Sequence, residues 1–442
     1  MINVPKPLWK KENSKDIFNQ TIKIKNRMKV LKIATAGSVD DGKSTLIGRI
    51  LYDTKSLTDD KLEAIKEKSI QRGFDYLDFS LATDGLVAAR EQGITIDVAH
   101  IYFSTSSKSY IIADTPGHIE YTRNMVTGAS TAQASIVLID ARNGVVEQTY
   151  RHFFINNLLR IKNVVIAINK MDLVDFSQEK FNVIKGEIEY LASKSEYKSQ
   201  KLTFIPISAL QGDNIVNKSE NTPWYSGNTL MKHLENIEAN DINDESQTRF
   251  PVQTVIRPKT KKYHDYRGYA GKLYGGDFEI GDEVKVLPSQ TTSKIKSINF
   301  FDKEFARAKR GSSVTITLED NVNVSRGDML VKVNQEPSIT KQINATVCWM
   351  DKEPLNRAQK YYIKHGVNDA QAKITNLSSI IKTDFSGIEE NPSKLELNQI
   401  GNIQLKLSKP LLVDAYSKNK QNGSFILINS RTNNTVGVGF IL

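Results

Sequence analysis

The sequence of 442 residues contains a single cysteine and no long apolar run. One thiol cannot form an internal disulfide, and it excludes a cysteine-rich metal site. Cys348 lies in an apolar segment, so we expect a buried strand residue rather than a reactive thiol, in a reducing cytoplasmic setting. The longest apolar stretches, such as 136–139 and 164–168, have strand length, whereas a membrane-spanning helix needs roughly 18 apolar residues. The sequence therefore predicts a cytoplasmic protein without a membrane partner.

Positive charge is concentrated in one short segment. The chain carries a net charge of +10, and its first 30 residues hold eight Lys or Arg against two acids, Glu12 and Asp16. The rest of the chain has only a modest positive excess, which argues against a nucleic-acid-binding surface. We interpret residues 1–28 as a basic N-terminal arm that aids solubility or contacts a partner.

Two patterns of apolar residues divide the remainder of the chain, which is too long for one hydrophobic core. Apolar runs alternate with helical stretches over residues 29–240, which predicts an α/β domain with a mostly parallel sheet and helices on both faces. After a polar, acidic linker, short β-branched runs are interrupted by Gly, Asn, Asp and Pro. These runs predict an antiparallel barrel or sandwich in each of two domains, residues 249–336 and 337–442.

Individual elements of the α/β domain can also be predicted, because buried parallel strands appear as continuous apolar runs. The expected strands are 31–36, 109–114, 135–140, 164–169 and 204–208, and the expected helices are 43–52 and 119–128.

The segment 37–44 fits the phosphate-binding pattern G-x-x-x-x-G-K-[ST], between an expected strand and an expected helix. Backbone amides of such a loop point toward the phosphates, and the start of the following helix favours negative charge. We expect Lys43 to contact the β- and γ-phosphates and the Ser44 hydroxyl to bind Mg2+. The other expected phosphate-binding residues are Gly37, Ser38, Val39, Asp40, Asp41, Gly42 and Thr45.

Candidate residues for catalysis follow the phosphate loop. Asp114, at the end of an expected strand, can hold Mg2+ through a water molecule, and the Gly117 amide can bond the γ-phosphate. His118 can orient the attacking water, the role of a Gln in other GTPases, although packing or capping is the alternative. Thr95 can reach Mg2+ through its hydroxyl and the γ-phosphate through its amide, although it could be an ordinary edge-strand residue. The predicted catalytic residues are His118, Lys43 and Thr95.

The run Asn169-Lys170-Met171-Asp172 ends another expected strand. The Asp172 carboxylate can accept two hydrogen bonds from guanine, whereas adenine presents the opposite polarity at its ring nitrogen. Because an unpaired buried carboxylate is costly, we expect the site to reject ATP. Asn169 should brace the base and the loop, and the segment beginning at Ser208 should offer a backbone amide to the guanine oxygen. The expected guanine-binding residues are Asn169, Lys170, Asp172, Ser208, Ala209 and Leu210. The motifs together predict a GTP site with Mg2+ as cofactor.

These motifs resemble those of the translation-factor GTPases, in which a P-loop GTPase domain precedes two β-barrels. Elongation factors typically carry His after the first Gly of the phosphate loop, whereas this chain has Ser38 there and Asp41 before Gly42. The run 37–49 instead resembles the large subunit of bacterial sulfate adenylyltransferase, the GTPase subunit of ATP sulfurylase. Further segments that resemble this family are 51–55, 90–97, 114–125, 249–253 and 267–271. Segments 77–87 and 193–201 depart from it, without touching a residue assigned a role.

The resemblance implies that the chemistry is divided between two chains. A separate small catalytic subunit binds ATP and sulfate, forms adenylyl sulfate and releases pyrophosphate, and this chain couples GTP hydrolysis to that uphill reaction. One alternative is an elongation-factor-type GTPase that binds aminoacyl-tRNA, which predicts salt-sensitive RNA binding. Another is a regulatory GTP-binding module whose hydrolysis is incidental.

Overall fold

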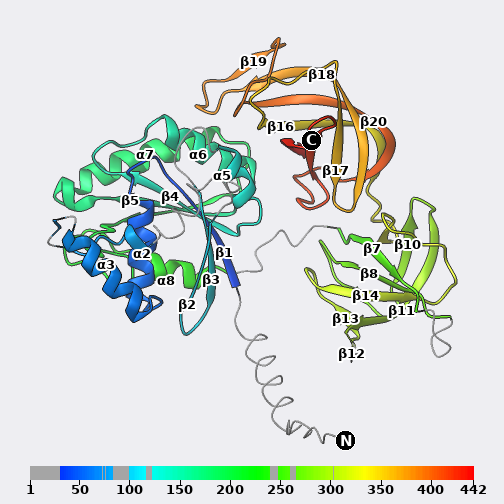
Figure 1. Ribbon diagram of the computed structural model, residues 1–442, viewed down its shortest axis with the longest axis horizontal. Helices are drawn as coiled ribbons and strands as arrows, with labels where there is room; N and C mark the ends of the chain where they lie inside the picture. Colours follow the sequence, from blue (N-terminus) through cyan, green and yellow to red (C-terminus); the bar gives the residue numbers. More distant parts are fainter. Residues whose placement is uncertain are drawn as a thin grey trace, which may run out of the picture. The chain divides into compact units, whose positions relative to one another are not determined.

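The protein, represented by a computed structural model, folds into two compact units that divide between Asp241 and Ile242. The first unit is an α/β domain and the second contains two β-barrels (Figure 1). Among the residues that the structure describes, no helix is long and apolar enough to cross a membrane. The described residues are 30–71, 73–74, 76–82, 99–115, 122–238, 247–258, 265–301 and 303–442.

A six-stranded sheet with the order β2-β3-β1-β4-β5-β6 forms the centre of the α/β domain. Only β2 and β3 pair antiparallel, and all other neighbouring strands run parallel. This mostly parallel sheet confirms the predicted class of the first domain. The strands are β1 (Val30–Ala36), β2 (Ala99–Ser104), β3 (Ser109–Asp114), β4 (Ala134–Asp140), β5 (Asn163–Asn169) and β6 (Lys201–Pro206).

Helices lie on both sides of this sheet (Figure 1). Every residue of β4 is buried, as expected for a central strand covered on both faces. On one face, Leu46 and Leu230 pack in the same core as Ile136 and Val165. The helices are α2 (Lys43–Asp53), α3 (Asp59–Gln71), α5 (Thr122–Ala129), α6 (Glu147–Leu158), α7 (Gln178–Lys194), α8 (Leu230–Asn236) and the short 3-10 helix η2 (Met171–Val174).

Two expected elements differ from the structure at their bounds. The strand expected at 204–208 is β6, which begins at Lys201 and ends at Pro206. Its first residues are exposed or partly exposed because β6 is an edge strand, so they lack the continuous apolar run of a central strand. The helix expected at 119–128 is described as α5 from Thr122 onward, and residues 116–121 lie outside the description.

The first barrel closes because β10 pairs with both β11 and β15. This ring of six strands, β10-β15-β7-β8-β14-β11, has β12 added beside β11 and surrounds a core that includes Phe250, Ile298 and Ile316. The strands are β7 (Phe250–Ile256), β8 (Gly268–Lys272), β9 (Phe278–Glu279), β10 (Glu283–Leu287), β11 (Thr291–Phe300), β12 (Lys303–Glu304), β13 (Arg307–Ala308), β14 (Ser313–Leu318) and β15 (Met329–Lys332).

The second barrel closes in the same way, through pairing of β17 with β18. Cys348 is fully buried in its strand β16, which confirms the expected buried thiol. The two closed antiparallel barrels confirm the rest of the predicted fold class. The strands are β16 (Ser338–Trp349), β17 (Lys360–His365), β18 (Asn368–Ile381), β19 (Ile388–Glu390), β20 (Ile400–Val413), β21 (Ser424–Asn429) and β22 (Thr435–Ile441).

A buried ion pair joins the two barrels. Arg249, immediately before β7, has no exposed area, and its Nε and Nη2 donate to the two carboxylate oxygens of Asp414 at 2.8 Å each. The Nη1 group donates to the carbonyl oxygens of Thr248 and Gln335, and the Asn422 amide donates to Asp414 at 2.8 Å. Since Asp414 follows β20, this network ties the start of one barrel to the end of a long strand in the other.

We expect Arg249→Ala to destabilise the second unit by about 3–5 kcal/mol, because it leaves the Asp414 carboxylate buried without its partner. Urea unfolding followed by the fluorescence of the buried Trp349 measures the loss. The matched control is Arg307→Ala, which removes surface ion pairs to Asp277 and Glu279 and should cost less than about 1 kcal/mol. Equal losses in the two variants would contradict the assigned role of Arg249.

Candidate functional site

Four loops of the described part of the chain lie at the carboxyl edge of the parallel sheet. They follow β1, β4, β5 and β6, and β3 ends at the same edge. In doubly wound sheets, ligands bind at this edge, beside the point where the strand order reverses. Here the order reverses around β1, which is followed by the predicted phosphate loop. The fold thus brings the predicted phosphate and base segments to the same edge.

The phosphate loop is closed by contacts between its own residues. Lys43 Nζ donates to the carbonyl oxygens of Gly37 and Ser38 at 2.7 Å each. The Asp41 carboxylate accepts the Ser38 amide at 2.5 Å. Burial lowers the pKa of Lys43 and raises the pKa of Asp41, while each group's charge favours ionisation of the other. The lysine ammonium is therefore held against the loop by carbonyl groups and placed for an anionic ligand.

Gly42 is required at the end of this loop for two reasons. Its φ of 94° lies in the left-handed region, which glycine adopts without steric cost. A Cβ atom at this position would lie 2.5 Å from Nδ2 of Asn169. The next residue, Lys43, begins α2, so the loop leads directly into the positive end of a helix.

Asn169, the last residue of β5, joins the phosphate loop to the loop after β6. Its Nδ2 donates to the carbonyl oxygen of Asp41 at 2.7 Å, and its Oδ1 accepts the Ala209 amide at 2.9 Å. The side chain is 1% exposed, so protein groups satisfy both of its polar ends. This contact places the predicted base-binding segment beside the predicted phosphate-binding segment.

The segment after β5 contains the predicted guanine-selecting carboxylate. Asp172 lies in η2 and is half-buried, so it is less enclosed than the buried carboxylate expected from the sequence. No ion pair or side-chain hydrogen bond to Asp172 occurs within the described part of the chain. The preceding Lys170 adopts a left-handed backbone conformation, with φ of 60°. The Asp172 carboxylate is therefore available to a ligand at this edge.

In the loop after β6, the amide available to a base belongs to Leu210 and not to Ser208 or Ala209. Ser208 is fully buried, and its hydroxyl accepts the Gln211 amide at 3.2 Å. The Ala209 amide is already donated to Asn169. The Leu210 amide makes no hydrogen bond within the described residues, and the Leu210 carbonyl accepts Arg49 Nη1 at 3.0 Å. Leu210 is thus the residue of this loop whose amide is open to a base.

Ser44 and Asp114 provide oxygen atoms of the kind that Mg2+ prefers. Ser44 lies in the first turn of α2 and is partly exposed. Asp114 ends β3 opposite Thr35 of β1, whose hydroxyl donates to its carboxylate at 3.2 Å. One hydroxyl and one carboxylate fit an ion that keeps several water and phosphate ligands, and they do not form an all-protein metal cage.

Three predicted site residues, Thr95, Gly117 and His118, lie outside the described residues. Their predicted roles remain predictions. The same holds for the basic arm, residues 1–28.

Sequence reasoning assigned no role to two residues that support the site. Asp140 ends β4, and its carboxylate lies 2.9 Å from Lys170 Nζ. Burial alone would raise the pKa of Asp140, but hydrogen bonds from Arg142 and Lys170 outweigh burial and lower it to about 2. Arg49 of α2 binds both Asp53 and the Leu210 carbonyl. The sequence could have indicated a role for Asp140, because it is a carboxylate at the end of an expected strand. No local pattern indicates the contact that Arg49 makes.

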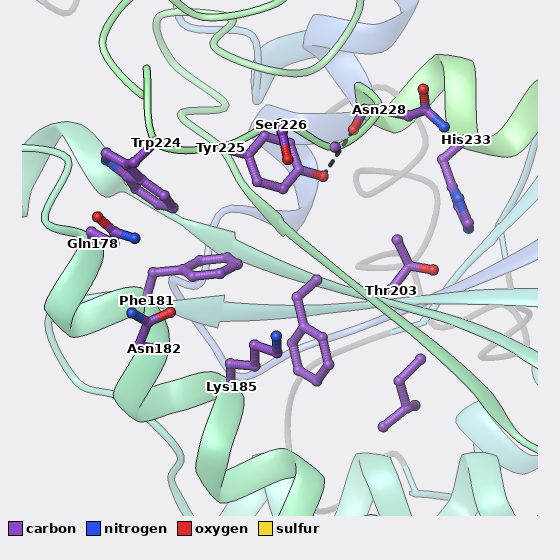
Figure 2. A pocket seen from close by; sticks show the side chains of 13 residues that line it. Gln178, Phe181, Asn182, Lys185, Thr203, Trp224, Tyr225, Ser226, Asn228 and His233 are labelled. Atoms are coloured by element: carbon purple, nitrogen blue, oxygen red, sulfur yellow. Dashed lines mark hydrogen bonds between the residues drawn. The ribbon is translucent and has the colours of Figure 1, made fainter.

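A separate hollow of about 470 Å³ lies beside the edge strand β6. It is lined by Phe181 and Lys185 of α7, by Trp224 and Tyr225, and by His233 of α8 (Figure 2). Burial lowers the pKa of His233 and raises the pKa of Tyr225 to about 12. None of the predicted site residues lines this hollow, so it is distinct from the loops at the carboxyl edge.

Comparison with known proteins agrees with this geometry. The model of the elongation factor Tu GTP binding domain matches residues 28–242, and the model of the GTP-eEF1A C-terminal domain-like family matches residues 342–442. The first unit is therefore a GTP-binding domain of the elongation factor Tu type. Among solved structures, sup35 complexed with GDP aligns over 94% of each chain, with 18% sequence identity and a TM-score of 0.42.

Curated relatives define the family more narrowly. The chain is 48% identical to the bifunctional enzyme CysN/CysC of Mycobacterium tuberculosis, over 93% of this chain and 67% of that protein. It is 48% identical to sulfate adenylyltransferase subunit 1 of Bacteroides fragilis, over 93% of this chain and 86% of that protein. Sulfate adenylyltransferase subunit 1 of Aliarcobacter butzleri is 47% identical, over 93% of this chain and 87% of that protein. The chain belongs to the sulfate adenylyltransferase subunit 1 family.

Gly42→Ala should weaken binding of fluorescently labelled GDP about 10- to 100-fold, because left-handed strain of about 1–3 kcal/mol adds to the displacement of Asn169. Equilibrium titration of the purified chain measures this affinity. The control is Gly186→Ala in α7, where a Cβ meets nothing within 4 Å and Ala favours the helix. An unchanged GDP affinity in Gly42→Ala would contradict the described role of the loop.

Proposed function

We propose that this chain is the GTP-hydrolysing subunit of a heteromeric sulfate adenylyltransferase, an ATP sulfurylase that acts in sulfate assimilation. The observation that carries the proposal is 48% identity over 93% of the chain to a protein named sulfate adenylyltransferase subunit 1. The hydrogen bonds of Asn169 to Asp41 and Ala209 support the nucleotide-binding part of the proposal, because they join the loops after β1 and β6. The substrates are ATP and sulfate, and the products are adenylyl sulfate and pyrophosphate.

In this proposal, the phosphate loop and the start of α2 hold the triphosphate. Backbone amides of the phosphate loop and of the first turn of α2 face the phosphates, and Lys43 contacts the β- and γ-phosphates. The hydroxyls of Ser44 and Thr95, and Asp114 through water, would hold Mg2+, and the bound ion would neutralise charge on the phosphate oxygens.

Selection of guanine falls to the loops after β5 and β6. Asp172 accepts hydrogen bonds from the ring N–H and the amino group of guanine, and the Leu210 amide donates to its oxygen. Lys170 belongs to the same segment as Asp172, and its Nζ lies 2.9 Å from a carboxylate oxygen of Asp140. Asn169 joins the loop after β6 to the phosphate loop through its hydrogen bonds with Ala209 and Asp41. Adenine would leave the Asp172 carboxylate facing a ring acceptor, which is strongly unfavourable.

Hydrolysis and coupling are assigned to residues near the γ-phosphate. His118 orients the attacking water, while Thr95 and Gly117 respond to the presence of the γ-phosphate. The resulting change drives a small catalytic subunit, which binds ATP and sulfate and carries out adenylyl transfer. This chain therefore catalyses only GTP hydrolysis, in the cytoplasm.

The elongation-factor alternative has less support. Relatives with 45–48% identity are named as sulfate adenylyltransferase subunits or as a bifunctional enzyme. The phosphate loop also has Ser38 where elongation factors typically carry His. A tRNA-binding chain would lose affinity by orders of magnitude as salt rises through physiological values, which a filter-binding titration would detect.

The decisive assay combines the purified chain with the small subunit encoded in the same genome. We expect pyrophosphate release from ATP and sulfate to increase on addition of GTP, because the adenylyl transfer is uphill without it. GDP in place of GTP is the control and should give no stimulation. Equal pyrophosphate release with and without GTP would contradict the proposed coupling.

Asp172→Ala should weaken GDP binding by about 100-fold or more, since one hydrogen bond to a charged group contributes about 1.5–3 kcal/mol. ADP binding should stay as weak as in the wild type. Calorimetric titration with both nucleotides measures this selectivity, and Asp175→Ala, at an exposed position just after η2, is the control. If the wild-type chain binds GDP no more tightly than ADP, the whole proposed function is contradicted.

His118→Ala should slow GTP turnover by about 100-fold or more, the range lost when a positioned catalytic group is removed. It should also abolish the stimulation of pyrophosphate release by GTP, while GDP affinity stays within about twofold of the wild type. Single-turnover hydrolysis separates this effect on chemistry from any effect on nucleotide binding. Full stimulation by GTP in the variant would favour the regulatory-module alternative.

A further inference from the structure

Three phenylalanine side chains lie on the surface of the first barrel, where β11 turns into β12. Phe300 is 48% exposed, Phe301 is 88% exposed and Phe305 is 43% exposed. We call these three residues the aromatic patch. Single exposed apolar residues are normal, but a group of large rings at one place marks an interaction site.

The aromatic patch continues the apolar core of the barrel to its surface. The Phe305 amide donates to the carbonyl oxygen of Ile298, a fully buried core residue, at 2.8 Å. Phe300 is two positions beyond Ile298 on β11, and alternate residues of a strand share a face. The rings of Phe300 and Phe301 contact each other, with centroids 4.6 Å apart. The rings of Phe300 and Phe301 therefore form one apolar surface, and the backbone hydrogen bond to Ile298 places Phe305, which follows β12, beside β11.

The backbone at Phe301 is unusual for an aromatic residue. Its φ is 53°, in the left-handed region that bulky residues rarely adopt and that glycine or asparagine would adopt at lower cost. Strained positions of this kind collect at binding sites. A residue that served only to turn the chain would not need a large ring here.

The segment that carries the aromatic patch is rich in positive charge. Segment 291–310 contains six Lys or Arg and two acidic residues. Lys294, Lys296 and Lys303 are exposed and form no ion pair within the described residues. Lys303 pairs directly with Phe300 across the β11–β12 hairpin. A complementary surface would be apolar at its centre and acidic at its border.

We propose that the aromatic patch docks the second subunit of the heteromeric enzyme, on an apolar surface bordered by Asp and Glu side chains. The inference rests on the proposed function, because the partner is the small subunit named there. The three rings supply the central anchors of the interface, and the lysines of the same segment steer the partner and set its orientation.

The test uses the full chain and the small subunit encoded in the same genome, with affinity measured by calorimetry. The double variant Phe301→Ser and Phe305→Ser should bind the small subunit at least about 30-fold more weakly, as expected for loss of interface hot spots. The matched control is Ile388→Ser, which removes a 56% exposed apolar residue from β19 of the other barrel. The control should bind within about threefold of the wild type, and GDP affinity should be unchanged in both variants.

A second variant separates docking from folding. Phe301→Gly removes the ring and relieves the left-handed strain, so the chain should be at least as stable as the wild type. It should still bind the small subunit about tenfold more weakly. Charge reversal by Lys296→Glu with Lys303→Glu should slow association and reduce its dependence on salt.

The outcomes distinguish this inference from the proposed function. If the wild type neither binds the small subunit nor stimulates it, the proposed function and the docking surface are both contradicted. If the wild type does both and the double serine variant binds equally well, the docking surface is overturned and the function stands. If the variants instead change GDP affinity or the oligomeric state of the chain alone, the aromatic patch serves the chain's own GTPase domain or a second copy, and the inference is overturned.

Discussion

The buried side chain of Asn169 is the contact on which the nucleotide site depends. It joins the phosphate loop, 128 positions earlier in the chain, to the loop after β6. Because water cannot reach it, its amide must find both a carbonyl and an N–H within the protein. Asp41 and Ala209 provide them. The separation between the phosphate half and the base half is therefore set by one rigid side chain, before any ligand binds.

Charged side chains also stabilise the loops of the nucleotide site, and they leave the expected ligand positions open. Lys43 is held by carbonyl groups, and Asp140 holds Lys170. Arg49 fixes the loop that carries Leu210 through its carbonyl, which leaves the amide of that residue unused. Contacts within the phosphate loop and side chains from other parts of the domain therefore shape the described loops before a ligand binds.

The second unit is stabilised differently from the first. Its two barrels each close their own core, and the buried Arg249 links them through an ion pair with Asp414, whose side chain is 9% exposed. A closed barrel leaves few free strand edges, so its surface properties depend on loops and hairpins such as β11–β12. This arrangement suits a unit that contacts another protein, while the chemistry of nucleotide binding stays in the α/β domain.

The sequence by itself determined the class of both units and the identity of the nucleotide motifs, because continuous apolar runs, glycine spacing and strand-end polar residues are local signals. It placed Asn169 in a base-binding motif, yet only the tertiary structure decided that its amide spans two loops and that Leu210, rather than Ala209, keeps a free N–H. The sequence likewise did not determine the edge position of β6 or the pairing of Arg249 with Asp414. Such contacts join residues far apart in the chain, and no local pattern encodes which distant groups meet.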